Sequence, residues 1–174
     1  MLDKLKYKIA EFIALRNLKG FDEPEKDFNK FFSESKKILL ILPIVQDDVN
    51  NCLDFFHFLV NNHKKVKLLR IAAVKISDLN TTDIINLKET DYNKLNLPNK
   101  EFITNLRKED FDITIDLGRE NNLIAGYLTK QSNTKYKIGF KKENSDIYYN
   151  FQVSDSSINS QISYRNLLNS LLMF

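Results

Sequence analysis

The stretch KKILLILPI, residues 36–44, decides the fold class. It is an apolar run closed by Pro43, and a strand that is buried on both faces has this character, as the strands of parallel sheets do. Further runs of this kind predict strands in KVKLLRIAAV (65–74), FDITIDLG (111–118), YKIGFKK (136–142) and IYYNFQV (147–153), with a short edge strand in DIINLKE (83–89).

Segments with helical spacing lie between these strands. We expect helices over 45–62, 100–110, 122–131 and 157–173. Strands that alternate with helices are joined by right-handed crossovers into a mainly parallel sheet. The sequence therefore predicts an α/β fold, a Rossmann-like three-layer sandwich.

An amphipathic helix is predicted from Met1 to Leu18, with Gly20 as its stop. A polar connector that contains Pro24 follows, with a short helix expected over 28–32. We therefore divide the chain into an N-terminal helix and connector, residues 1–36, and a single Rossmann-like domain, residues 37–174.

Composition excludes several classes of protein. The 174 residues suit one domain, and a net charge of +3 is too small for a nucleic-acid-binding protein. No apolar run is long enough to cross a bilayer, and charges interrupt every candidate signal peptide. One cysteine cannot form an internal disulfide, so we expect a cytoplasmic protein.

Ligands of open parallel sheets bind beyond the carboxyl ends of the strands. The segment PIVQDD (43–48) places Asp47 and Asp48 there, at the start of a helix. Either carboxylate is a candidate general base for a substrate hydroxyl, or a candidate ligand-binding residue. The alternative is that both carboxylates cap the helix.

The segment DLGRENN (116–122) occupies the corresponding position after a later strand. Gly118, Arg119, Asn121 and Asn122 can hold an anionic small ligand at the helix start, or form an ordinary strand-to-helix turn. Lys141 and Lys142, after the next strand, add either a modest basic patch with Lys135 and Lys137 or solvated charges.

The sequence gives no support for a nucleotide-cofactor site, a metal site or a nucleophilic cysteine. A single glycine in 116–122 matches neither a dinucleotide fingerprint nor a P-loop, so no cofactor is predicted. His57 and His63 lack further ligands at metal-binding spacing, so we expect no metal. Cys52 lies on the apolar stripe of its helix and is expected in the core.

The N-terminal helix leaves three interpretations open. It packs on its own domain, forms a homodimer or protein-partner contact, or rests on an anionic membrane surface through Lys4, Lys6, Lys8, Arg16 and Lys19. Asp3 and Glu11 dilute that positive charge, which favours packing.

From Lys37 to about Ser154 the chain resembles the N-terminal, acceptor-side domain of the heptosyltransferases, glycosyltransferase family 9. KKILLILPIVQDDV (36–49) resembles the first strand and loop of that family, and FDITIDLGRENNLIAGYLTKQSNTKYKIGF (111–140) resembles a later strand–helix–strand unit. The resemblance implies that Asp48 matches the family's candidate base. Asp47 stands where the family has a glycine, which is a departure from its pattern.

Members of that family need a second domain of similar size to bind the sugar nucleotide. The resemblance therefore implies either a non-catalytic, single-domain binding or assembly module, or half of a glycosyltransferase that works with a separate donor-binding domain. A nucleotide-binding protein is a third interpretation.

Overall fold

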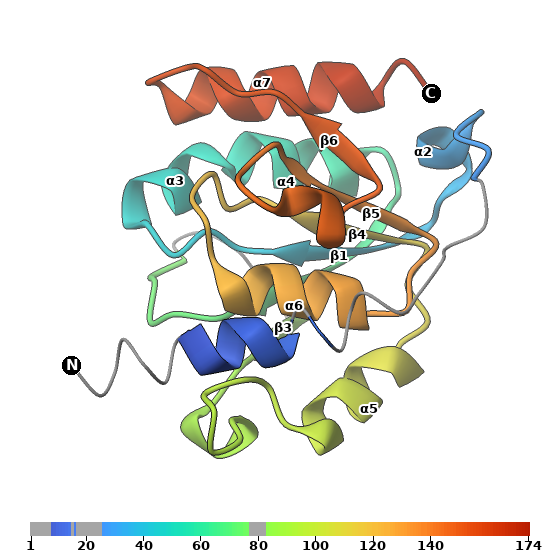
Figure 1. The fold of residues 1–174 in the computed structure, drawn as a ribbon. Coiled ribbons are helices and arrows are strands. Elements are labelled where there is room, and N and C mark those ends of the chain that lie inside the picture. The colour runs from blue at the N-terminus through green and yellow to red at the C-terminus, as the bar shows by residue number, and fades with distance from the viewer. Residues whose placement is uncertain (1–7, 15, 17–25, 77–82) are drawn as a thin grey trace.

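Six parallel strands form the sheet of this computed structural model, in the order β3-β2-β1-β4-β5-β6 (Figure 1). The structure describes residues 8–14, 16, 26–76 and 83–174. All the neighbouring strand pairs are parallel, which confirms the predicted Rossmann-like α/β fold. The strands are β1 (Lys37–Ile41), β2 (Lys65–Arg70), β3 (Ile84–Asn86), β4 (Ile113–Asp116), β5 (Tyr136–Phe140) and β6 (Phe151–Val153).

The central strand β1 is buried on both faces, as its apolar run predicts. Residues 38–41 have no exposed surface. Because successive side chains of a strand point to opposite faces, Ile38 and Leu40 join one apolar cluster, while Leu39 and Ile41 join another. Two separate cores, one on each side of the sheet, make the three layers.

Helices cover both faces of the sheet, and short helices join some of the strands (Figure 1). On one face lie α3, α4 and α7, and on the other lie α5 and α6. The helices are α2 (Phe31–Glu34), α3 (Gln46–Asn51), α4 (Leu53–Asn61), α5 (Lys100–Lys108), α6 (Leu123–Gln131) and α7 (Ser160–Leu171), with 3-10 turns η1 (Glu89–Asp91) and η2 (Ser145–Ile147).

The helix predicted over 45–62 is two helices, α3 and α4, that meet at Cys52. The Cys52 sulfur contacts the carbonyl oxygen of Val49 at 3.2 Å, a local bond that competes with regular helix geometry. Cys52 is 1% exposed, as predicted for a core residue. Burial, reinforced by the charge of Asp48, raises the pKa of its thiol to about 12, so it is no nucleophile at neutral pH.

The strand predicted over 147–153 is shorter than expected, because only its last three residues pair with β5. Tyr148 and Tyr149 lie instead in the turn between η2 and β6. Their rings pack on two glycines, Tyr148 on Gly126 of α6 and Tyr149 on Gly139 of β5. The aromatic residues that suggested a strand therefore fill space above residues without side chains.

The N-terminal helical segment, residues 8–14 and 16, packs on its own domain. Ala10 and Ala14 are buried against Leu97 and Leu123, whereas Ile9 and Phe12 are 42% and 65% exposed. The rest of the predicted helix, with Lys4 and Lys6, lies outside the described residues, as does Lys19 after it. The proposed partner and membrane contacts of this helix stay predictions, as does the division of the chain at residue 36.

None of the helices in the described ranges combines the length and the apolar character that crossing a bilayer requires.

The close approach of Tyr149 to Gly139 leads to a testable prediction. A Cβ atom at Gly139 would lie 2.8 Å from two atoms of the Tyr149 ring, so Gly139→Ala forces the ring to move. We expect this change to lower the free energy of unfolding by about 2 kcal/mol, measured by urea denaturation.

A double variant that carries both Gly139→Ala and Tyr149→Ala has no such clash, because the Tyr149 ring is gone. The double variant should therefore be more stable than the sum of the two single losses predicts. Strict additivity would contradict this account of the packing.

Candidate functional site

The carboxyl ends of β1 and β4 form the switch point of the sheet, where the strand order reverses. From β1 the chain continues to β2 on one side, and from β4 to β5 on the other. A crevice opens at such a point in α/β sheets and is their usual ligand site. Here the loop after β1 leads into α3, whose first turn carries Asp47 and Asp48, and the loop after β4 carries Gly118 and Arg119.

Arg119, in the loop after β4, connects α3 with the loop between β6 and α7 at this crevice. Its Nη1 atom lies 3.6 Å from Oδ1 of Asp48, and its Nε donates to Oδ2 of Asp155 at 2.9 Å. A second guanidinium nitrogen donates to the carbonyl oxygen of Ser157. The side chains of Asp48, Arg119 and Asp155 are 12%, 19% and 10% exposed. We call these three residues the Arg119 cluster.

Electrostatics favour the charged forms in this cluster. Burial opposes the charge of Arg119, but the hydrogen bond and charge of Asp155, together with Asp48, outweigh it and raise the pKa of Arg119. Burial would raise the pKa of Asp155 as well. Hydrogen bonds from Arg119, Ser163 and the backbone N–H of Ser157 outweigh that effect, so the pKa of Asp155 lies below its ordinary value.

The crevice beside the Arg119 cluster is closed. Residues from both loops line a cavity of about 10 Å³, among them Pro43, Asp48, Asp116 and Arg119. A single water molecule needs at least roughly this volume. The space beside Asp48 and Arg119 is therefore too small for a substrate in this structure.

A buried polar cluster follows at the end of β4. Asp116 is fully buried, and its carboxylate accepts hydrogen bonds from the Tyr149 hydroxyl and the Gly118 N–H. Lys142 donates its ammonium to the Gly118 carbonyl at 2.7 Å and lies 3.3 Å from the Asp116 carboxylate. Burial, then the charge of Asp116, raises the pKa of Tyr149 well above its ordinary value, so Tyr149 stays a donor. These contacts neutralise the charge of Lys142 inside the protein.

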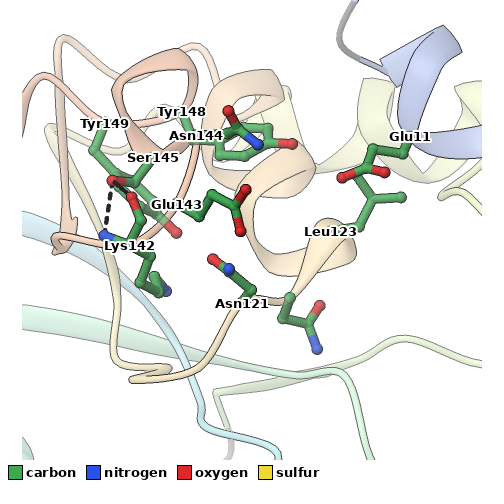
Figure 2. A pocket seen from close by; sticks show the side chains of 10 residues that line it. Glu11, Asn121, Leu123, Lys142, Glu143, Asn144, Ser145, Tyr148 and Tyr149 are labelled. Carbon is green, nitrogen blue, oxygen red and sulfur yellow. Dashed lines mark hydrogen bonds between the residues drawn. The ribbon is translucent and has the colours of Figure 1, made fainter. Parts of the chain in front are cut away.

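An open pocket of about 240 Å³ lies next to this buried cluster (Figure 2). We call it the open pocket. Its walls come from the start of α6, the segment from Lys142 through η2 to Tyr149, and the N-terminal helical segment. The polar residues that line it include Glu11, Asn121, Asn122, Glu143, Asn144 and Ser145.

The predicted site residues are thus divided among three places. Asp48 and Arg119 form an ion pair at the crevice, with Gly118 beside them, and Asn121, Asn122 and Lys142 line the open pocket. Asp47 and Lys141 are exposed and line neither space.

The structure shows which of the predicted site residues cap a helix or form a turn. Neither Asp47 nor Asp48 caps α3, because its N-cap residue is Val45 and both carboxylates lie in its first turn. Asn122 does cap α6, since its side chain accepts the N–H of Ala125 at 3.0 Å. The φ angle of Gly118 is not positive, so its turn does not need glycine for its backbone conformation.

Sequence reasoning missed three residues of these clusters. Asp116 stands at the end of a predicted strand, and that position could have identified it. Asp155 and Tyr149 come from a distant loop and from a segment predicted as strand, so only the fold brings them to Arg119 and Asp116. No group of three potential metal ligands occurs within the described ranges.

Comparison with known proteins identifies the fold. A family model described as "Family of unknown function (DUF6913)" matches residues 6–171, whereas no curated protein matches the sequence. A solved structure of the glycosyl transferase family 9 from Veillonella parvula DSM 2008 is similar, with a TM-score of 0.57 and 17% identity.

The match to that structure covers 78% of this chain and 41% of the transferase chain, so this chain spans about two fifths of the length of that protein. At this identity the similarity establishes the fold alone. It confirms the resemblance predicted from the stretches 36–49 and 111–140.

The lowered pKa of Asp155 leads to a prediction about stability and pH. The unfolded chain protonates this carboxyl at a higher pH than the folded chain does, so its stabilising contribution is full above about pH 4 and is lost as the pH falls further. At pH 7 we expect Asp155→Asn to lower the free energy of unfolding by about 2 kcal/mol.

Chemical denaturation at several pH values measures this difference. The gap between wild type and Asp155→Asn should narrow below about pH 4. Asp47→Asn, an exposed change in the first turn of α3, is the control and should cost at most about 0.5 kcal/mol. A gap for Asp155→Asn that is constant with pH would contradict the role of its charge.

Proposed function

Because the chain belongs to the DUF6913 family, of unknown function, and has the fold of a family 9 glycosyl transferase, we propose that it is a non-catalytic binding module with a glycosyltransferase-like fold. In this function the sheet serves as a rigid support. The loops at its carboxyl edge bind a partner or a small ligand, and no bond is made or broken.

The observation that carries this proposal is the closed crevice at the Arg119 cluster. A general base must come within about 3 Å of the proton that it removes. The Asp48 carboxylate faces Arg119 instead, and the volume of the cavity beside it is about 10 Å³. An acceptor hydroxyl would have to break the ion pair and displace the loops before it could reach Asp48.

The open pocket supports the binding part of the proposal. It has about 240 Å³ of space, and polar side chains from three segments of the chain line it. Convergent polar groups in a concave space are typical of ligand sites. Binding can therefore take place beside the crevice without opening the Arg119 cluster.

A second candidate is half of a glycosyltransferase that works with a separate donor-binding protein. The observation in its favour is the coverage of the match, which extends over 41% of the transferase chain. An enzyme built on this domain would need the part of such a chain that the match does not cover. It would also need a rearrangement that frees Asp48 from Arg119.

A transfer assay tests the proposal. The purified chain is incubated with nucleotide sugars and a mixture of saccharide acceptors, and released nucleotide is measured. We expect no release above background, with wild type and Asp48→Asn identical. Transfer that Asp48→Asn abolishes and Asp47→Asn leaves intact would contradict the proposal. Transfer that appears only after addition of a co-purifying protein would support the second candidate.

Stability gives an independent readout for Asp48. If Asp48 serves the fold through Arg119, Asp48→Asn should lower the free energy of unfolding by about 1 kcal/mol, because the pair is long and partly exposed. Replacing a catalytic carboxylate is commonly neutral or stabilising. A rise in the free energy of unfolding of Asp48→Asn would therefore support a catalytic role for Asp48.

A further inference from the structure

The charge of the open pocket is negative. Glu11 and Glu143 line it, and neither carboxylate has an ion pair with any described residue. Lys142 is the cation among the described lining residues, and its ammonium is paired with the buried Asp116. Among the described lining residues, two carboxylates thus face the pocket without a compensating cation.

Uncommitted hydrogen-bond acceptors converge on the same space. Figure 2 shows the Glu143 carboxylate and the Asn121 amide on one side of the pocket, with Glu11 reaching it from the N-terminal helical segment. Asn144 also lines the pocket. Within the described chain, none of these four side chains makes a hydrogen bond. A ligand rich in donors would satisfy them.

Size and shape limit the ligand further. A space of about 240 Å³ admits a small molecule, and the Tyr148 and Tyr149 rings form part of its wall. The Tyr148 ring packs on Gly126, which fixes its position beside α6. The face of an aromatic ring attracts a cation.

Resting on the proposed binding function, we infer that the open pocket binds a small organic cation through a primary ammonium group. The ammonium has three N–H donors for the carboxylates of Glu11 and Glu143 and the amide oxygen of Asn121 or Asn144. A quaternary ammonium has no such donors and would leave these acceptors unsatisfied. The sequence left an anionic ligand open because Arg119 and Lys142 follow strands at this edge of the sheet. Asp48 and Asp155 pair with Arg119, however, and Asp116 pairs with Lys142.

The test is a titration of the full chain, followed by two-dimensional NMR of labelled backbone amides at low salt. The probes are putrescine for a primary ammonium, choline for a quaternary one, acetate and phosphate for anions, and glycerol for a neutral polyol. We expect putrescine to shift the amide signals of Asn121 and Asn144 and to bind more weakly as salt is added. Choline, the anions and glycerol should leave these signals in place.

Variants of the pocket carboxylates test whether putrescine binds in the open pocket. Glu143→Gln keeps the shape of the side chain and should weaken putrescine binding by about tenfold, as should Glu11→Gln. Glu101→Gln, an exposed change in the first turn of α5, is the matched control and should leave binding unchanged.

Other outcomes overturn the inference. Equal binding by wild type and Glu143→Gln, a response to acetate or phosphate in place of putrescine, or no response to putrescine would each do so. A failure here is distinct from a failure of the proposed function, which only sugar transfer dependent on Asp48 would reveal.

Discussion

The contact of Arg119 with Asp48 and Asp155 determines what the carboxyl edge of the sheet can do. These residues belong to the first turn of α3 and to two loops, all far apart in the sequence, and one guanidinium holds them together. Arginine suits this position because its planar, permanently charged group can donate to several acceptors at once. The cost of its partial burial is offset by two carboxylates and a carbonyl. The same contacts fill the place where this fold usually accepts a substrate.

Much of the fold could be predicted from the apolar runs of the sequence. The run over 36–44 and the alternation of strands with helices predicted the parallel pairing, because burial on both faces requires such runs. The order of the strands in the sheet was not predicted. The break at Cys52 could not be predicted, since no glycine or proline marks it. The shortened β6 could not be predicted either, because tyrosines that pack over glycines have the same composition as a strand.

The candidate site was predicted less completely, and the reason is physical. Strand ends can be found from local sequence, so Asp48, Arg119 and Lys142 were identified. Whether a charged group faces a ligand or another part of the protein depends on contacts between distant segments. Lys142 lies 26 residues from Asp116 in sequence, and Arg119 lies 36 residues from Asp155. The folded structure alone shows that these cations are already paired.

The two edges of the sheet carry a further consequence. The edge strands β3 and β6 are three residues each, so few backbone N–H and C=O groups are left unpaired along either margin. Long, flat edges are the surfaces through which sheets join one another and aggregate. Short edges remove most of that hazard for the described part of the chain. Recognition of another molecule must then rely on side chains, whose identity evolution can change without disturbing the sheet.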